Sequence, residues 1–397
     1  MTELRPDAEH DAVCASRVHH QVVVAPPGTG KTTVSVRLAA ELLPDLAAHA
    51  RVLVLTFSKE ARTQLEREAA RQLPAAARRR IEITNYHRFL LQGVAAYRRA
   101  LGLAERLDPG SSRRRREALE AIDRDAVRRL DREHSGLIDA LGEHAFEQSR
   151  DERTPAPELL DPLLEIVDAE QRAGRLVFDD FGALFWRLLE EFPIVERAYL
   201  ARYPVVIADE HQDASALQDA LVRRLGTVRL TVLADPMQLI HGFRGARMER
   251  LDRHREECDE ELLLNTPHRW HGSEHLAEWL LAVRARLMGE QAEVVRPAEL
   301  HVVRTNAAHG TGPIKAQVRA AILRSRADGL RRIGVIVTTN NDARDFRGYL
   351  TREGLRPRQI GGNDFEEART DIEQLPLLTD PQTLALHALE RVQALVP

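Results

Sequence analysis

Short apolar runs and stretches with apolar residues at helical spacing follow one another near the start of the chain. The β-branched run within His20–Val24 predicts a buried strand, and Thr32–Leu43, beyond a Pro/Gly-rich turn, predicts a helix. Further along, the apolar run Val205–Ala208 predicts another buried strand, and a helix is expected from Ala214. The first of these regions therefore places a strand, a glycine-rich turn and a helix in direct succession.

The last third of the chain also alternates between helical and extended patterns. The expected elements are a helix over Ser273–Met288, a strand over Leu300–Arg304, a helix over Lys315–Arg326, a strand over Ile333–Val337, a helix over Asn341–Glu353 and a helix over Pro381–Val396. Alternating strands and helices predict a parallel sheet with helices packed on it. This part of the chain is therefore predicted to be α/β.

The stretch from residue 90 to residue 201 has a different pattern. The run Arg113–Arg116 and the Arg/Glu/Leu pattern after it predict amphipathic helices with solvated charged faces. Asp151–Pro162, rich in acidic residues and proline, predicts a loop. The arginine run could contact phosphate, but a charge run is usually a solvated face, and we favour that interpretation.

Composition narrows the class of protein. The chain has 397 residues, of which 43% are hydrophobic and 30% charged, so it is neither collagen-like nor wholly disordered and is long enough for more than one domain. It has no apolar run near the roughly 18 residues of a membrane span and no signal-peptide core at its start, so we expect a cytoplasmic protein without a membrane partner. Its two cysteines, Cys14 and Cys258, indicate neither a disulfide framework nor a zinc site. The net charge of −4 suggests that any nucleic acid is bound in a local groove.

The glycine-rich turn carries the clearest chemistry. Backbone N–H groups of such a turn, together with the dipole of the following helix, form an anion site. Lys31 would reach the β- and γ-phosphates of a nucleotide, and the Thr32 hydroxyl would bind Mg²⁺. The strict pattern opens with glycine, and a small residue, Ala25, stands there instead. The expected nucleotide-binding residues are Ala25, Pro26, Pro27, Gly28, Thr29, Gly30, Lys31, Thr32 and Thr33.

An acidic pair at the end of the second predicted strand completes the expected site. Asp209 would hold Mg²⁺ together with Thr32, and Glu210 would orient or deprotonate the attacking water. The alternative is a purely structural acidic loop, in which Asp213 caps the following helix. Behind a phosphate loop, the catalytic interpretation is favoured.

Several further segments, taken in order, resemble the UvrD/Rep-like branch of superfamily 1 helicases. The matching segments are Val52–Ala61 (motif Ia), Ile83–Phe89 (the next DNA-side motif), Asp209–Asp213 (the DExQD form of motif II), Leu233–Ala246 (motif III), Leu264–Trp270 (the segment of the first arginine finger) and Ile333–Thr338, followed by Asn341, Arg344, Leu350, Gly361, Gly362, Phe365 and Arg369 (the opening of the second motor domain). One such motif is weak evidence, whereas several in the right order are hard to obtain by accident.

The resemblance implies roles for individual residues. Gln238, placed at the end of a predicted strand, would sense the γ-phosphate, and Arg269 would stabilise charge in the transition state. The expected DNA contacts are Thr56, Phe57, Phe243 and Arg244. Tyr86 and His241 could also stack on bases, but for these two we favour a structural role. Glu9 stands where the family usually reads adenine with glutamine, which weakens the case for a preference for ATP.

The resemblance also implies an organisation. Residues 1–89 and 202–272 would form a RecA-like, parallel-sheet P-loop motor domain, residues 90–201 a helical insertion, and residues 273–397 a linker helix with part of a second RecA-like domain. The family's motifs V and VI are not found in the sequence. The chain could therefore be truncated, be completed by a protein partner, or be a natural short form that uses ATP as a switch.

Two functional hypotheses remain open. The first is an ATP-dependent helicase or translocase that moves 3′ to 5′ on single-stranded DNA, with ATP and Mg²⁺ as cofactors. The second is a nucleotide-gated DNA-binding subunit of a repair or phage-defence complex that does not unwind DNA by itself. An unrelated phosphate-loop enzyme, such as a small-molecule kinase, ranks far lower because it leaves motifs Ia and III without a purpose.

Overall fold

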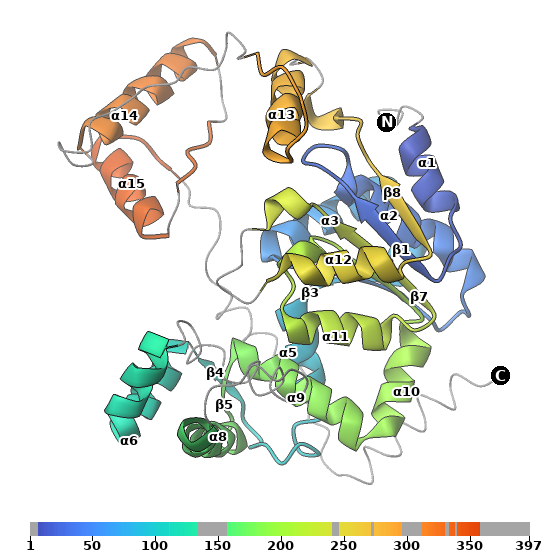
Figure 1. The fold of residues 1–397 in the computed structure, drawn as a ribbon, viewed down its shortest axis with the longest axis vertical. Coiled ribbons are helices and arrows are strands. Elements are labelled where there is room, and N and C mark those ends of the chain that lie inside the picture. Colours follow the sequence, from blue (N-terminus) through green and yellow to red (C-terminus); the bar gives the residue numbers. More distant parts are fainter. Residues whose placement is uncertain are drawn as a thin grey trace. The chain divides into compact units, whose positions relative to one another are not determined.

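The computed structural model describes residues 7–110, 112–133, 157–239, 246–270, 274–295, 312–329, 333–337 and 340–357. By its contacts the chain divides into two units, one holding the residues up to Ser273 and the other beginning at Glu274. Figure 1 shows the ribbon of both units with their helices and strands labelled.

The first unit is built on a six-stranded sheet in which every pairing of neighbouring strands is parallel, in the order β3-β2-β6-β7-β1-β8. The strands are β1 (His20–Val24), β2 (Val52–Thr56), β3 (Ile81–Asn85), β6 (Val205–Ala208), β7 (Arg229–Ala234) and β8 (Glu260–Leu263). The helices that accompany the sheet are α1 (Ala8–Ala15), α2 (Lys31–Leu42), α3 (Lys59–Gln72), α4 (Ala75–Arg78), α5 (Tyr86–Ala96), α9 (Phe178–Glu191), α10 (Pro193–Arg202), α11 (Ala216–Leu225) and α12 (Met248–Glu257). The predicted α/β fold with a parallel sheet is thereby confirmed.

The sheet separates two apolar cores, because successive side chains of a strand point to opposite faces. Val23 of β1 belongs to the core that contains α1, α2 and α3, with Leu38 and Leu65 fully buried in it. Val22 belongs to the core that contains α5, α9, α11 and α12, where Phe181 and Phe185 are fully buried. Helices on both faces explain why every residue of β1 is buried and not only every second one.

The predicted helical insertion contains helices and a short additional sheet. Strand β4 (Asp108–Gly110) pairs in parallel with β5 (Arg175–Val177), while α6 (Ser112–Glu133) and α8 (Pro157–Arg172) pack around their own small apolar cluster. The loop expected over Asp151–Pro162 is wrong in its last part, because α8 begins at Pro157. Proline is well tolerated in the first helical turn, and the leucines that follow it continue a helical pattern.

One member of the arginine run is structural. Arg115 is buried, and its guanidinium binds both carboxylate oxygens of Asp180, at 3.1 and 2.6 Å. Arg113 pairs with Glu117 at 2.8 Å, and Arg114 with Asp108 at 2.7 Å. Arg113, Arg114 and Arg115 are therefore engaged in ion pairs inside this unit.

Two predicted element ends are also corrected. The helix expected from Ala214 begins at Ala216, and its cap is the Ser215 hydroxyl, not Asp213, because Ser215 and Gln218 form a capping box. The strand expected to end at Gln238 ends at Ala234, because Pro236 lacks the N–H that a strand would need, and Gln238 closes a short 3-10 helix (Pro236–Gln238).

The second unit, in its described part, consists of helices α13 (Glu274–Leu287), α14 (Gly312–Ala327) and α15 (Asn340–Arg352). Helices α14 and α15 share a small core of Ile322, Leu350 and Leu355 and are joined by an ion pair between Lys315 and Asp345 at 2.6 Å. The strand expected over Ile333–Val337 is wrong. These residues lack a paired neighbour among the described residues, and Ile336 is 98% exposed.

The expected elements Leu300–Arg304 and Pro381–Val396 lie outside the described residues. Among the helices that the structure does describe, none combines the length and the apolar character needed to cross a membrane.

Candidate nucleotide site

The loop between β1 and α2 has the backbone geometry of an anion site. The Ala25 N–H continues the pairing of β1 with β7 by donating to Ala234 O at 3.0 Å, and the Thr29 hydroxyl then closes a turn onto Pro26 O at 2.8 Å. Gly28 and Gly30 have φ values of 85° and 88°, a conformation that side chains with a Cβ rarely adopt. A Cβ on Gly30 would also lie 2.6 Å from the His10 ring. Glycine is therefore required at the start of α2.

Lys31 meets the acidic pair directly. Its Nζ lies 2.7 Å from Glu210 Oε2, and the Lys31 side chain is nearly buried. Thr32, next to it, is half-buried. The Thr33 hydroxyl donates to Glu68 of α3 at 3.0 Å, so Thr33 turns its side chain away from the loop. The structure thus brings Lys31 and Glu210 together from segments far apart in the sequence.

Asp209 is buried without a hydrogen-bond partner on Oδ1. Its backbone N–H donates to Leu55 O of β2 at 2.7 Å, which fixes the residue at the end of β6. Burial, and then the charge of Glu210, raise the pKa of its carboxyl to about 7, against the opposing effect of Lys31. A buried carboxylate oxygen that lacks a partner is suited to a cation.

Thr56, expected to contact DNA, lies beside this aspartate instead. Its side chain is fully buried, and it helps to lower the pKa of Asp209. A residue in that position supports the acidic site and does not reach solvent.

Glu210 has φ 53° and is the one non-glycine residue of positive φ among the described residues. Such a conformation costs free energy and persists only where neighbouring residues hold it. Gln212 donates to Glu210 Oε2 at 2.9 Å and accepts from the Asp235 N–H at 3.1 Å. Asp235 in turn accepts from Gln238 Nε2 at 2.7 Å. The predicted γ-phosphate sensor is thereby connected through two residues to Glu210.

Helix α1 and the segment after β8 close around the loop. Glu9 accepts the N–H groups of Asn265 and Thr266 at 2.7 and 3.1 Å. The Arg269 N–H donates to Gly28 O at 3.0 Å, while the Arg269 side chain is exposed. The carboxylate of Glu9 is therefore engaged with backbone, and Arg269 is tethered to the phosphate loop with its guanidinium accessible.

Two histidines beside the loop were missed by sequence reasoning. His10 Nε2 lies 2.9 Å from Thr29 O, and His268 is hydrogen-bonded to the Asp7 carboxylate. Burial tends to raise the pKa of Asp7, but His268 and the charge of His10 lower it overall. One indication in the sequence could have drawn attention to this region, because Asp7 is suited to cap α1. In the structure Asp7 does cap α1, by accepting from the Glu9 and His10 N–H groups.

The expected DNA-side residues are only partly described. Phe57 is half-buried directly after β2. Phe243 and Arg244, with His241, lie outside the described residues. Tyr86 is 2% exposed and its hydroxyl lies 2.9 Å from His211 Nδ1, which agrees with the structural role favoured for it.

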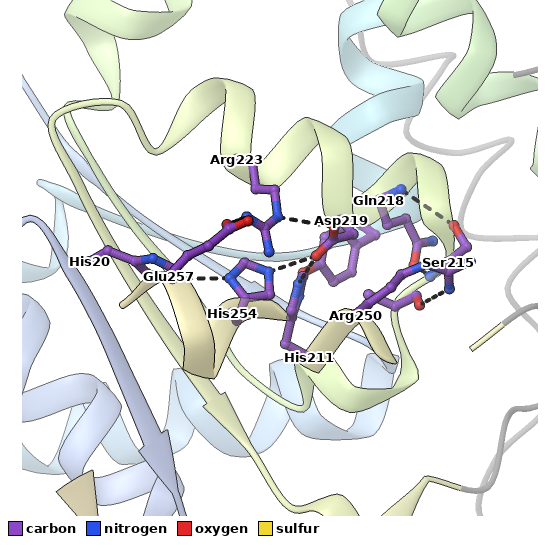
Figure 2. Close-up of polar contacts among 11 residues, drawn as sticks. His20, His211, Ser215, Gln218, Asp219, Arg223, Arg250, His254 and Glu257 are labelled. Atoms are coloured by element: carbon purple, nitrogen blue, oxygen red, sulfur yellow. Dashed lines mark hydrogen bonds and ion pairs between the residues drawn. The ribbon is translucent and has the colours of Figure 1, made fainter. Parts of the chain in front are cut away.

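Behind the acidic pair lies a buried polar network that the sequence did not reveal (Figure 2). Asp219 Oδ1 accepts from His211 Nε2 at 3.0 Å and from His254 Nε2 at 2.6 Å, and Asp219 Oδ2 accepts from Arg223 at 3.1 Å. His254 Nδ1 lies 3.0 Å from His20 Nε2. The distances from the Asp219 carboxylate to the histidine nitrogens are those of hydrogen bonds, and Arg223 adds a positive charge to the cluster. Hydrogen bonding therefore accounts for the cluster better than a metal ion does.

The charges of this network follow from its contacts. Despite burial, the two histidine hydrogen bonds hold the pKa of Asp219 far below its usual range, and burial lowers the pKa of His254 to about 4. Asp219 is therefore ionised and accepts only, which requires a proton on Nε2 of both histidines. Burial raises the pKa of Tyr86 well above its usual value, so its hydroxyl keeps its proton and can donate to Nδ1 of His211.

Comparison with known proteins identifies the family. The model of the UvrD/REP helicase N-terminal domain matches residues 7–259. The chain is 24% identical over 398 residues to the ATP-dependent DNA helicase UvrD1 of Mycobacterium tuberculosis, an alignment that covers 91% of this chain and 50% of that protein. It is 25% identical over 258 residues to DNA helicase II of Salmonella typhimurium, covering 62% of this chain and 35% of that protein. The chain thus spans about half the length of the first of these relatives. Together with the parallel sheet, the match places the chain in the UvrD/REP helicase family.

Proposed function

We propose that this chain binds ATP with Mg²⁺ in the loop between β1 and α2 and hydrolyses it in response to single-stranded DNA. Its role would be that of the motor portion of a DNA helicase or translocase that moves 3′ to 5′. The observation that carries the proposal is the 2.7 Å contact between Lys31 and Glu210 beside the unpartnered Oδ1 of Asp209.

The Lys31–Glu210 contact suggests how nucleotide would prepare the site. A multiply charged phosphate in the loop competes with one carboxylate for Lys31 Nζ. Glu210, still hydrogen-bonded by Gln212, would then be free to accept a proton from the attacking water. Gln238 would sense the γ-phosphate through its link to Asp235, and Arg269 would stabilise the transferred charge.

Asp209 and Thr32 are the proposed Mg²⁺ ligands. The unpartnered, buried carboxylate oxygen of Asp209 fits a hard divalent cation that prefers oxygen. When bound, the ion would neutralise part of the charge on the transferred phosphoryl group. The rest of the loop would bind phosphate mainly through backbone N–H groups, because the Thr33 side chain is already bonded to Glu68.

The proposed domains follow the expected organisation. Residues 1–89 and 202–272 would form the motor domain, residues 90–201 the insertion, and residues 273–397 the linker helix with part of a second RecA-like domain. Phe57, at the carboxyl end of β2, is the proposed base-stacking residue among those described, with Phe243 and Arg244 as further candidates.

A nucleotide-gated DNA-binding subunit is the second candidate function. The chain spans half the length of UvrD1, so hydrolysis and unwinding are separate proposals. In this second case a protein partner would supply the remaining motor elements. Strand separation on tailed duplexes discriminates between the two, because the motor separates strands on its own and the subunit binds DNA without separating them.

Steady-state ATP hydrolysis with and without single-stranded DNA tests the proposed function. We expect stimulation by DNA, and a loss of about 100-fold in Glu210→Gln, which removes the proton acceptor. The matched control is Glu256→Gln, an exposed glutamate of α12, which should hydrolyse ATP as the wild type does. A wild-type chain that binds nucleotide but hydrolyses it at background with DNA present would contradict the proposal.

A further inference from the structure

The buried network of Figure 2 includes His211, the residue directly beside Glu210 of the proposed hydrolysis site. His211 directly follows Glu210 and is 4% exposed. Both of its ring nitrogens are occupied, Nδ1 by the Tyr86 hydroxyl at 2.9 Å and Nε2 by Asp219 at 3.0 Å. A ring held at both nitrogens has little freedom to rotate or shift, so it fixes the backbone at its own position.

Fixing that backbone matters for Glu210. The left-handed φ of 53° at Glu210 has to be held by the residues on either side. On one side, the Asp209 N–H is bonded to Leu55 O of β2 at 2.7 Å. On the other side stands the doubly bonded ring of His211. Lys31 and Gln212 hold the carboxylate of Glu210, and the Asp213 N–H donates to its carbonyl oxygen at 3.2 Å. The contacts of Asp209 and His211 fix the chain on either side of it.

Tyr86 links His211 to the carboxyl ends of β2 and β3. It is the first residue of α5 and directly follows β3, whose last residue, Asn85, is paired in register with Thr56 at the end of β2. Phe57, the proposed base-stacking residue, follows Thr56. A displacement at the carboxyl ends of β2 and β3 is therefore passed to the Tyr86 hydroxyl and from there to His211.

We propose that Tyr86 and His211 are positioning residues for Glu210, and that their hydrogen bond transmits the binding of single-stranded DNA at the ends of β2 and β3 to the hydrolysis site. This inference rests on the proposed function. Neither residue touches the nucleotide, and both act through the backbone of Glu210.

The rest of the network serves as the fixed end of this link. Asp219 is held by Arg223 and by His254, and His254 is backed by His20 at the start of β1. Because His20 and the phosphate loop lie at opposite ends of the same strand, the anchor of His211 is tied to the strand that carries the loop. Because Asp219 is held in place, a displacement of Tyr86 is not absorbed at that end of the ring and acts on the backbone beside Glu210.

The test compares DNA stimulation of ATP hydrolysis in single variants. Tyr86→Phe removes one hydroxyl. His211→Gln replaces the rigid ring by a flexible amide that can still donate to Asp219 but no longer holds the Tyr86 hydroxyl at Nδ1. Each should lower the ratio of DNA-stimulated to basal kcat about tenfold while leaving KM for ATP within about twofold. In the double variant the ratio should fall no further than in either single variant, because both changes break the same bond.

The matched control is Tyr203→Phe. Tyr203 is also buried, and its hydroxyl donates to a carboxylate, that of Glu82, at 2.6 Å. The hydroxyl makes its hydrogen bonds with Glu82 and Arg202 and not with the acidic pair. A merely structural effect lowers the amount of folded protein and so reduces basal and stimulated rates in proportion. The ratio in Tyr203→Phe should therefore stay at the wild-type value.

The outcomes separate this inference from the proposed function. A wild-type chain without DNA-stimulated hydrolysis overturns the proposed function and the inference with it. Wild-type stimulation that survives unchanged in Tyr86→Phe overturns the inference alone. A reduced ratio in Tyr86→Phe and His211→Gln, with Tyr203→Phe unchanged, supports both.

Discussion

Asp209 and Asp219 are two buried aspartates of the same unit, ten positions apart in the sequence, in opposite electrostatic situations. Burial and the neighbouring Glu210 raise the pKa of Asp209 to about 7, and its Oδ1 lacks a hydrogen-bond partner. Asp219 receives hydrogen bonds from two histidines, which hold its pKa far below the usual range despite burial, and a further one from Arg223.

The difference shows how buried carboxylates divide between function and support. A carboxylate with all its partners supplied by the protein stabilises the fold and has nothing left to offer a ligand. A carboxylate buried with an unpartnered oxygen costs stability until a cation arrives. By this criterion Asp209 belongs to the site and Asp219 to its support, although both sit in the same acidic stretch of the chain.

The largest expected effect comes from removing the charge of Asp209. Asp209→Asn should lower Mg²⁺-dependent ATP hydrolysis by about 100-fold or more, because charge neutralisation by a bound metal contributes several kcal/mol. The same variant, without nucleotide or divalent ion, should be more stable than the wild type by roughly 1–2 kcal/mol, because it no longer buries an ionisable group. ATPase assays and urea unfolding measure the two effects.

The comparison fails at this point if Asp209→Asn proves less stable than the wild type in the metal-free protein. That result would mean that Asp209 is a structural carboxylate with partners the static contacts do not reveal. Asp45→Asn serves as the control, since Asp45 is exposed and pairs only with Arg17 on the surface. Its stability should change by no more than about 0.5 kcal/mol.

The second effect is the opposite response of Asp219. Asp219→Asn should destabilise the protein by about 3 kcal/mol, because it leaves the Arg223 charge without its buried partner and weakens both histidine hydrogen bonds. Urea unfolding measures the change. The control Asp252→Asn, a partly exposed aspartate of α12 that pairs with Arg255, should stay within about 0.5 kcal/mol.

If the Asp219→Asn variant is as stable as the wild type, the network is redundant, and the proposed difference between Asp219 and Asp209 is contradicted. Destabilisation with normal nucleotide affinity of the folded protein would place Asp219 firmly outside the site. Nucleotide affinity is therefore measured on the same preparations.

How far the sequence predicted this site depends on the range of the interactions involved. The strand, turn and helix around Gly28 and Gly30, and the acidic pair after β6, are local patterns whose residues are neighbours in the chain, and they were found. That the acidic pair belongs with the phosphate loop was predicted from the chemistry that a nucleotide site needs. The direct contact between Lys31 and Glu210, which are 179 positions apart, was not predicted. Fold class and family were predicted from the sequence, and the structure and comparisons confirm both.

The network around Asp219 could not be predicted in the same way. His20, His211 and His254 show no common spacing, and each reads as an ordinary polar residue within its own element. They meet only because β1, the turn after β6 and helix α12 converge beside α11. The strand predicted over Ile333–Val337 was wrong for a related reason. A strand exists only where a partner pairs with it, and a local apolar pattern does not specify the partner.

The third prediction compares how His254 and Asp209 make the stability of the protein depend on pH. His254 has a pKa of about 4 in the folded protein against 6.5 for its ordinary value, so between these limits the unfolded chain binds more protons, and stability falls as pH drops from about 6.5 to 4. For Asp209 the folded pKa is about 7 against 3.8, so the folded protein binds more protons, and stability falls as pH rises from about 4 to 7. One unit of pKa difference corresponds to about 1.4 kcal/mol, so the contributions reach at most about 3 kcal/mol for His254 and about 4 kcal/mol for Asp209 over these ranges.

Difference curves isolate the two groups in metal-free protein. The stability of the wild type relative to His254→Gln, which keeps a donor for Asp219 but does not titrate, should rise from pH 4 to pH 6.5. The stability of the wild type relative to Asp209→Asn should fall from pH 4 to pH 7. Chemical unfolding at a series of pH values supplies both curves, and slopes of the same sign would refute the division between the two aspartates. Slopes of opposite sign would mean that the same unit holds a carboxylate prepared for a cation, Asp209, and a fully paired network that keeps its neighbour Glu210 in place.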